Sequence, residues 1–234
     1  MEAIILAGGL GTRLREQVPD LPKPMAPVGG RPFLEHQIDY WIDQGVSRFI
    51  LSVGYKREVI ERRFGDMYRD AEITYAVEDK PLGTGGGLLL SVGKLKKQKS
   101  FILLNGDTFF EVDLSDMENL HSRKNSDVTV ALHQVKENMR YGSVKLESDA
   151  RITDFNGAPD AGNSLINGGV YIINKTALDA TKWRAGDSFS VENDLFPAMI
   201  ESSARFYGYV SNGRFIDIGV PEDYQRSGEL LGKR

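Results

Sequence analysis

The sequence of 234 residues contains no cysteine and only three histidines. Without cysteine, the chain has no disulfide framework, no thiolate metal site and no cysteine nucleophile. It also lacks a basic excess, because 29 Lys and Arg stand against 33 Asp and Glu, which disfavours a nucleic-acid-binding protein. No apolar run approaches the roughly 18 residues of a transmembrane helix, and the N-terminus lacks the basic start of a signal peptide. We therefore expect a cytoplasmic protein with neither a membrane nor a nucleic-acid partner.

The N-terminal half alternates short apolar runs with helical patterns. Strands are predicted at residues 3–6, 49–53, 73–77 and 101–104, and helices at residues 33–44, 58–64 and 84–95. This alternation predicts parallel strands with helices on both faces of the sheet.

The second half has strands without helices between most of them. Strands are predicted at residues 128–132, 142–146, 152–155, 169–173, 205–210 and 215–218, with helices at residues 191–202 and 221–231. No Pro/Gly/Ser linker separates the halves, which favours one domain over residues 1–234. The predicted fold class is α/β, a Rossmann-like three-layer α/β/α arrangement with a mixed, mostly parallel central sheet. Its ligand site should lie at the carboxyl ends of the N-terminal strands.

A glycine-rich turn, Leu-Ala-Gly-Gly-Leu-Gly-Thr-Arg-Leu, follows the first predicted strand at residues 6–14. Its spacing matches neither the dinucleotide fingerprint nor a Walker loop. The glycines alone are equally compatible with a flexible turn and with a phosphate-binding loop. Arg13 favours phosphate binding, because a guanidinium can hold a phosphate with two parallel hydrogen bonds.

Two prolines, Pro22 and Pro24, restrict the backbone on both sides of Lys23. This arrangement suits a lysine aimed at a fixed anion, and a stiff surface loop is the alternative. A further glycine-rich segment, residues 78–87, follows the third predicted strand and opens a helix. Its N–H groups favour a phosphate or a base, whereas an ordinary N-cap by Thr84 is the structural alternative.

Asp107 directly follows a buried strand in the segment Asn-Gly-Asp-Thr. An aspartate there can hold Mg²⁺, which prefers one or two carboxylates together with phosphate oxygens. Asp residues that cap loops after strands are also common, and such a loop cap is the alternative.

In this order the four motifs resemble those of the sugar-1-phosphate nucleotidyltransferases, also called NDP-sugar pyrophosphorylases. Asn-Gly-Gly at residues 167–169 and the segment 215–224 extend the resemblance over nearly the whole chain. The resemblance implies a nucleotide-diphospho-sugar transferase fold, with a nucleotide-binding half at residues 1–115 and a sugar-phosphate-binding half at residues 116–234. It also implies transfer of a nucleoside monophosphate from a nucleoside triphosphate to a sugar 1-phosphate, with release of pyrophosphate.

Within this family, the chain is similar to the short members that use GTP and D-glycero-D-manno-heptose 1-phosphate. The alternatives are a uridylyl-, cytidylyl- or thymidylyltransferase acting on another hexose 1-phosphate, and a non-catalytic regulatory homologue. The oligomeric state stays open, and a homo-oligomer is one of the states that the sequence allows.

The resemblance also implies roles for individual residues. The catalytic residues would be Arg13, Lys23 and Asp107. Mg²⁺ would be held by Asp107 and Asp217. The nucleotide would be bound by Ala7, Gly8, Gly9, Gly11, Thr12, Arg13, Glu78, Gly83 and Thr84. The sugar phosphate would be bound by Tyr141, Gly142, Asn167, Gly168 and Glu192, although residues 190–194 also have the pattern of a helix start.

Glu78 bears on the choice of base. A carboxylate only accepts hydrogen bonds, which suits the adjacent N1–H and N2–H groups of guanine and not the carbonyls that flank the N–H of uracil. Glu78 therefore favours GTP, unless its side chain points to solvent and the backbone of Ala7, Gly8 and Gly83 selects the base.

One segment departs from the family pattern. Many members carry Glu-Lys-Pro with a lysine that grips the sugar phosphate, and the matching position here is Ala158. Arg140, Lys145 or another cation would have to replace that lysine. We expect the three histidines, His36, His121 and His133, to be structural or solvated, because the ionised phosphate of the acceptor needs no general base.

Overall fold

The structure is a computed structural model that describes residues 1–9, 11, 14, 18–96, 98–136, 140–158, 162 and 164–231. At its centre, β1 (Glu2–Leu6) pairs in parallel with β4 (Arg48–Val53) on one side and with β7 (Ser100–Asn105) on the other. β6 (Ala71–Val77) lies beyond β4, also in parallel. β1, β4 and β7 are buried almost throughout, as apolar strands covered on both faces must be. The predicted parallel arrangement is confirmed.

The strands of the second half continue the same sheet. β12 (Ser164–Asn174) pairs antiparallel with β7, which joins the two halves of the chain. Ten strands within the described residues form this mixed sheet. The strands not yet named are β5 (Met67–Tyr68), β9 (Val128–Val135), β10 (Ser143–Leu146), β11 (Ile152–Gly157) and β13 (Phe206–Ser211).

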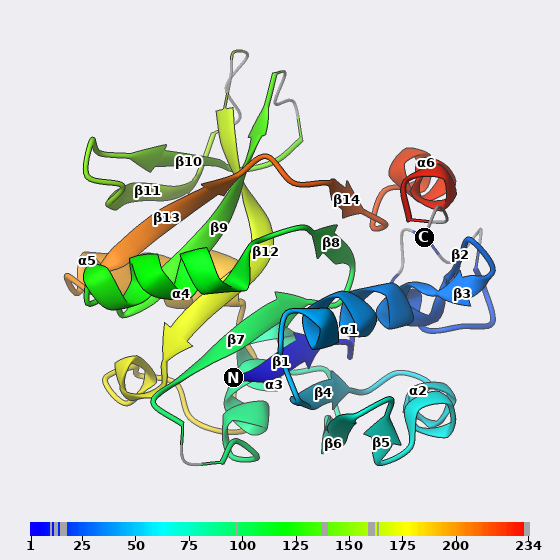
Figure 1. The fold of residues 1–234 in the computed structure, drawn as a ribbon. Helices are drawn as coiled ribbons and strands as arrows, with labels where there is room; N and C mark the ends of the chain where they lie inside the picture. Colours follow the sequence, from blue (N-terminus) through cyan, green and yellow to red (C-terminus); the bar gives the residue numbers. More distant parts are fainter. Residues whose placement is uncertain are drawn as a thin grey trace.

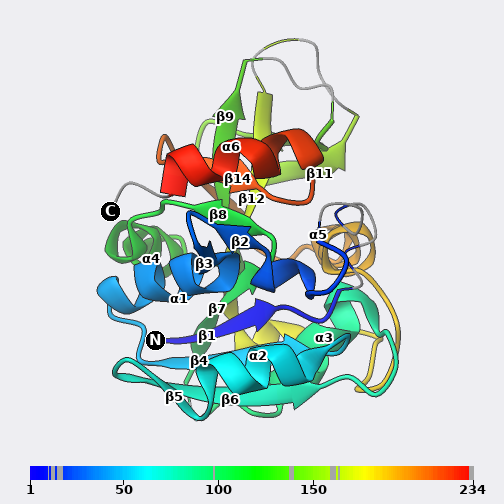
Figure 2. The same cartoon turned by 90° about the vertical axis from the view of Figure 1, so that its right-hand side faces the viewer.

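Helices cover both faces of the sheet (Figures 1 and 2). Successive side chains of a strand point to opposite faces, so Ala3 and Ile5 enter one apolar core and Ile4 enters the other. The first core is covered by α1 (Phe33–Asp43), α2 (Arg57–Phe64) and α4 (Leu114–Arg123). The second is covered by α3 (Gly83–Val92) and α5 (Phe196–Glu201). Among the described residues, none of the helices combines the length and apolar character needed to cross a membrane.

Several short elements that the sequence patterns did not predict surround the strand ends. They are the turn η1 (Lys23–Met25), the hairpin of β2 (Pro27–Val28) and β3 (Arg31–Pro32), β8 (Thr108–Phe110), and the turn η2 (Lys175–Leu178). β8 pairs with β14 (Phe215–Asp217) in a separate two-stranded sheet. The C-terminal α6 (Pro221–Leu231) lies against β2 and β14 (Figure 1).

The helix predicted at residues 191–202 differs from the observed element. Its first part is the π-helical turn η3 (Val191–Leu195), in which the carbonyl of Ser190 accepts from the N–H of Leu195 at 3.0 Å. Pro197 then lies in the first turn of α5, and it has no N–H with which to extend a regular ladder backwards. The helix predicted at residues 84–95 also differs from the observed element, because α3 ends at Val92.

The glycines at the start of α3 make room for a neighbouring loop. A Cβ on Gly85 would lie 2.2 Å from ring atoms of Phe189, and a Cβ on Gly86 would lie 2.4 Å from the backbone oxygen of Asp187. The loop also accepts from α3 directly, because Gly85 N–H donates to Phe189 O at 2.9 Å. Close packing therefore explains glycines that the sequence analysis linked to ligand binding.

We expect Gly86→Ala to lower the free energy of unfolding by about 1–3 kcal/mol, because the new methyl group meets fixed backbone atoms. Gly93→Ala is the matched control, since its Cβ would come no closer than 3.5 Å to Leu90 O. Urea unfolding of both variants checks this. Equal midpoints for the two variants would contradict the packing explanation.

Candidate active site at the carboxyl ends of the parallel strands

The register of the parallel strands brings the sequence motifs to one edge of the sheet. Leu6 at the end of β1 is opposite Ser52 on β4 and Asn105 on β7. Gly106 N–H donates to Leu6 O at 3.1 Å, and a Cβ on Gly106 would lie only 2.4 Å from that oxygen. The glycine-rich turn after β1 and the Asn-Gly-Asp segment after β7 are therefore neighbours, as parallel strands require.

A cavity of about 560 Å³ opens at this edge. Most of the residues predicted to bind the nucleotide line it, namely Ala7, Gly8, Gly9, Gly11, Glu78, Gly83 and Thr84. Lys23, Asp107 and Glu192 line it too, together with residues that the sequence analysis did not select, such as Pro81 and Asn105. Thr12 and Arg13 lie outside the described residues.

Lys23 points at Asp107. The Lys23 Nζ atom lies 2.5 Å from Asp107 Oδ2, and the lysine side chain is only 12% exposed. The glycine turn packs on the lysine stem, since a Cβ on Gly11 would lie 2.9 Å from Lys23 Cβ. The proline-flanked lysine is thus held at the edge of the sheet where the cavity opens, and not in a loop on the surface.

Asp217 reaches the same place from a strand more than a hundred residues further along the chain. β14 pairs with β8, so Asp217 is opposite Thr108, and Ile218 N–H donates to the backbone oxygen of Asp107 at 3.0 Å. Asp217 Oδ1 accepts from Gly219 N–H at 2.7 Å. A Cβ on Gly219 would lie 2.5 Å from Lys23 Nζ and 2.7 Å from Asp217 Oδ1, so both groups crowd this glycine.

The two aspartates fit a magnesium site that the substrate completes. Within the described residues, no group of three or more His, Cys, Asp or Glu side chains could hold a metal ion by itself. Mg²⁺ normally takes one or two carboxylates and completes its octahedron with water and phosphate oxygens. Asp107 and Asp217 supply that kind of donor set at the edge of the cavity.

A second cavity, of about 280 Å³, adjoins the first and shares Asn105, Asp107 and Glu192 with it. It contains most of the residues predicted to bind the sugar, namely Tyr141, Gly142, Asn167 and Glu192, as well as the metal candidate Asp217. Its other lining residues include Thr108, Phe155, Asn193 and Phe215, which the motifs alone did not reveal.

The Asn-Gly-Gly segment is placed one residue differently from the prediction. Gly168 is buried away from the second cavity, where an added Cβ would lie 2.3 Å from the Phe110 ring. Gly169 lines the cavity instead, with φ +72°, at the register shift between Asn167 and Tyr171. This backbone conformation suits glycine, because it has no Cβ to clash.

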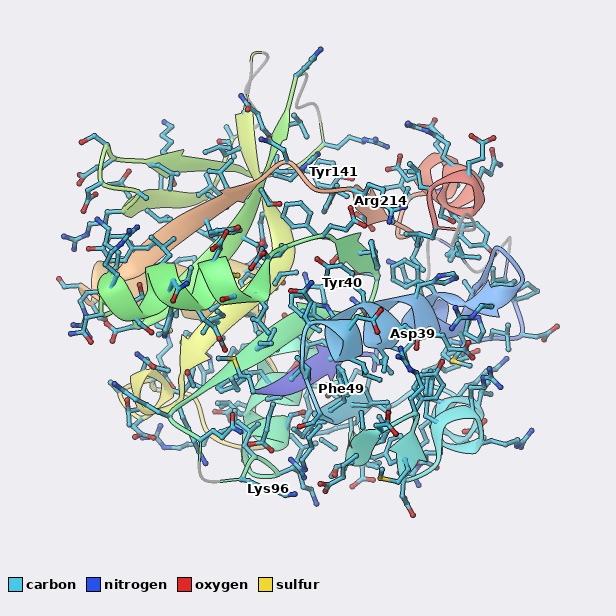
Figure 3. All side chains as sticks on the ribbon, viewed as in Figure 1. Asp39, Tyr40, Phe49, Lys96, Tyr141 and Arg214 are labelled. Atoms are coloured by element: carbon cyan, nitrogen blue, oxygen red, sulfur yellow. The ribbon has the colours of Figure 1, made fainter. Side chains whose placement is uncertain are left out.

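Aromatic rings border the second cavity. Tyr141, labelled in Figure 3, lies near β14, with its ring centroid 6.2 Å from that of Phe215. Burial, followed by the neighbouring charge of Asp217, raises the pKa of Tyr141 to about 12. Its hydroxyl therefore keeps its proton at neutral pH and can act as a hydrogen-bond donor.

Glu78 is fixed under the glycine-rich turn. Its Oε1 accepts from the buried Ser52 hydroxyl at 2.9 Å, and its Oε2 accepts from Leu82 N–H at 3.1 Å. A Cβ on Gly8 would lie 2.6 Å from Glu78 Oε1, so the glycine-rich turn packs directly on this carboxylate. The side chain therefore lies in the wall of the first cavity instead of pointing away into solvent.

Thr84 does not cap α3. The N-cap residue of α3 is Leu82, which makes no side-chain cap bond, and Thr84 instead bonds to the chain around Glu192. Ser190 does cap the later helix start, because its Oγ accepts from Asn193 N–H at 3.1 Å. Residues 190–194 thus form a helix start, and Glu192 from the same turn also faces both cavities.

Neither replacement for the missing lysine lines the second cavity. Lys145 is 71% exposed and lies 3.9 Å from Asp154. Arg140 lies 3.4 Å from Asp223 and borders a third, smaller cavity that shares Tyr141, Phe215 and Asp217 with the second. Arg140 is therefore the better placed of the two cations.

The three histidines contact the surrounding fold and line neither the first nor the second cavity. His36 bonds to Val28 O at 2.9 Å, and His121 bonds to Thr129 Oγ1 at 2.8 Å. Burial lowers the pKa of all three, and the His133 ring stacks on Phe215 at 5.0 Å.

The sequence profile described as "Nucleotidyl transferase" matches residues 2–233. The chain belongs to the nucleotidyl transferase family. It is 44% identical to a D-glycero-alpha-D-manno-heptose 1-phosphate guanylyltransferase from Aneurinibacillus thermoaerophilus, over 99% of this chain and 98% of the relative. It is 40% identical to the enzyme of the same name from Campylobacter jejuni, over 96% and 97% of the two chains.

A solved structure of a further relative has the same fold. HddC from Yersinia pseudotuberculosis, complexed with GMP-PN, is 35% identical and superposes with a TM-score of 0.84 over 98% of this chain and 99% of the other. The family resemblance inferred from the motifs is confirmed, and so is the fold class that it implied.

We expect Lys23→Met to lower nucleotidyl transfer by about 10²–10³-fold, because an aimed cation that meets developing phosphate charge is lost. Lys80→Met is the matched control, because Lys80 is exposed in the loop between Glu78 and Pro81. Steady-state pyrophosphate release measures both. Turnover of Lys23→Met within a few fold of the control would exclude a role for Lys23 at the reacting phosphate.

Proposed function

We propose that this nucleotidyl transferase transfers GMP from GTP to D-glycero-D-manno-heptose 1-phosphate, giving GDP-heptose and pyrophosphate. The observation that carries the proposal is a pair of adjoining cavities that meet at Asp107, in a chain 44% identical to a heptose 1-phosphate guanylyltransferase. The first cavity would take the nucleotide and the second the sugar, so residues 1–115 and 116–234 would form the two binding halves.

The reaction is an in-line displacement at phosphorus. An oxygen of the sugar phosphate forms a bond to the α-phosphorus of GTP while the bond from that phosphorus to the bridging oxygen of pyrophosphate breaks. The attacking oxygen is already ionised, so no proton has to be removed. Both reactants are anionic, and the site must therefore offset their repulsion and align them.

Lys23 lies where the two reactants would meet. Its ammonium, now 2.5 Å from Asp107, could turn to the α-phosphate without leaving the edge of the sheet. Arg13, on the glycine-rich turn, would add a second cation on the triphosphate side. Asp107 and Asp217 would hold Mg²⁺, which when bound neutralises phosphate charge and orients the phosphate oxygens.

Glu78 would select guanine. Its two oxygens each accept one hydrogen bond from the protein, from Ser52 and Leu82, and each oxygen has room for a second. Guanine N1–H and N2–H could supply these two bonds side by side. Uracil and cytosine offer no such pair of adjacent donors.

On the sugar side, the described residues supply amides, a phenol and aromatic faces in place of further cations. Asn167, Asn193 and Tyr141 line the second cavity with polar groups suited to sugar hydroxyls. Arg140, next to that cavity, would approach the sugar phosphate from the side of Asp217. A cytoplasmic location stays a prediction of the sequence, which leaves the oligomeric state open.

Pyrophosphate release from GTP, ATP, UTP, CTP and dTTP, each with heptose, mannose and glucose 1-phosphates, tests the proposed function. We expect GTP with the heptose 1-phosphate to have the highest kcat/KM, and Mg²⁺ removal by EDTA to abolish turnover.

Glu78→Gln should lower kcat/KM for GTP by about tenfold or more, since a charged hydrogen-bond acceptor is lost. Asp79→Asn, an exposed neighbour, is the control. A wild-type preference for UTP would contradict the role of Glu78.

The cation near the sugar phosphate can be identified with two matched variants. Arg140→Met should raise KM for the sugar 1-phosphate about tenfold and leave KM for GTP within about twofold, because one charge-assisted contact is lost. Lys145→Met should change neither, since its side chain points into solvent. If Lys145→Met has the larger effect, the segment rearranges on binding and Arg140 is the wrong choice.

A further inference from the structure

Glu192 lies in the wall between the two cavities, and four hydrogen-bond donors converge on its carboxylate. Oε1 accepts from Asn105 Nδ2 at 3.1 Å and from the Tyr171 hydroxyl at 3.3 Å. Oε2 accepts from Thr84 Oγ1 at 3.0 Å and from Ser190 Oγ at 3.3 Å. The donors come from α3, β7, β12 and the turn before η3, so one side chain joins four parts of the chain.

Both hydroxyls on the Oε2 side also accept a backbone N–H. Thr84 Oγ1 already accepts from Val191 N–H at 2.8 Å, and Ser190 Oγ already accepts from Asn193 N–H at 3.1 Å. Each hydroxyl therefore accepts from a backbone N–H and donates its own proton to Glu192 Oε2, so both groups are held on two sides.

The Oε1 side is fixed in the same way. Asn167 Oδ1 accepts from Gly169 N–H at 3.0 Å, which turns its Nδ2 toward the Tyr171 oxygen at 2.6 Å. Tyr171 is completely buried, and this burial raises its pKa well above the ordinary range, so the phenol keeps its proton. That proton is directed to Glu192.

A carboxylate has about four acceptor positions, and here four donors fill them. No position remains for a hydroxyl of the sugar, although Glu192 is exposed to both cavities. We propose that Glu192 is a positioning residue that ties the nucleotide cavity to the sugar cavity, and that it is not a ligand of the sugar. This inference rests on the proposed function, because it assigns one substrate to each cavity.

The hydrogen bonds around Glu192 connect residues that line different cavities. Thr84 lines only the first cavity. Asn105 lies two residues before Asp107, and Asn167 lies in the second cavity. Loss of the Glu192 carboxylate would therefore loosen three groups together. They are Thr84 in the wall of the first cavity, the strand end that carries Asp107, and the Asn167 amide. Loss of a simple sugar ligand would affect the second cavity alone.

The test compares Thr84→Val, Thr84→Ser, Glu192→Gln and the Thr84→Val/Glu192→Gln double variant. Calorimetry gives Kd for GTP with Mg²⁺ and no sugar phosphate, and pyrophosphate release gives KM for the sugar 1-phosphate. We expect Glu192→Gln to raise both constants roughly threefold to tenfold. Thr84→Val should also raise KM for the sugar 1-phosphate, although Thr84 does not line that cavity. Thr84→Ser, which keeps the hydroxyl, should raise both constants less than Thr84→Val does.

The double variant distinguishes one shared hydrogen-bond network from independent contacts of Thr84 and Glu192. We expect its losses to be close to those of Glu192→Gln alone, because both substitutions cut the same network. The proposal is overturned if Glu192→Gln raises KM for the sugar while Kd for GTP is unchanged, or if the two losses add. Wild-type protein that releases no pyrophosphate from GTP with any sugar 1-phosphate overturns the proposed function and this inference together. Thermal unfolding of each variant confirms that the assays compare folded proteins.

Discussion

The short antiparallel pair formed by β8 and β14 holds the two aspartates of the site together. Ile218 N–H donates to the Asp107 backbone oxygen at 3.0 Å, and this contact spans more than a hundred residues of sequence. Asp107 itself is placed by β7, which lies beside β1 in the buried sheet. The proposed metal site therefore depends on this long-range strand pair, which connects the C-terminal segment to the parallel core. Lys23 lies beside the same two aspartates.

The net charge of the chain differs from the charge of the segment proposed to meet the phosphates. The chain has a net charge of −4, yet residues 8–31 contain four basic residues against two acidic ones. Of these basic residues, Lys23 lines the first cavity, whereas Arg31 pairs with Glu35 and Asp39. Within the described residues, the second cavity is lined by Asp107, Glu192 and Asp217 and by no Lys or Arg. Asp107 and Asp217 are proposed to hold the metal ion, and Glu192 accepts hydrogen bonds from four donors. Affinity for phosphate follows from where the cations lie and not from the total.

Much of this arrangement could be predicted from the sequence because it is local. The apolar runs that became β1, β4, β6 and β7 were recognised to within two residues. Lys23, Asp107 and Asp217 are far apart in the sequence, and only the family resemblance indicated that they lie together. The other contacts between distant segments were out of reach. The glycines at the start of α3 serve the packing of Phe189, Thr84 bonds toward Glu192, and Gly169 lines the cavity where Gly168 was expected. No local pattern reveals such contacts, because each depends on a partner at least fifty residues away.

In the proposed function, Asp107 and Asp217 hold one divalent cation at the boundary between a guanine-binding cavity and a sugar-binding cavity. A crystal structure with GDP-heptose and Mn²⁺ in place of Mg²⁺ tests this most directly, because the anomalous signal locates the ion. We expect a single Mn²⁺ peak coordinated by both aspartates, with the guanine edge against Glu78 and the sugar beside Asn167. A peak coordinated elsewhere, or a guanine turned away from Glu78, would contradict it.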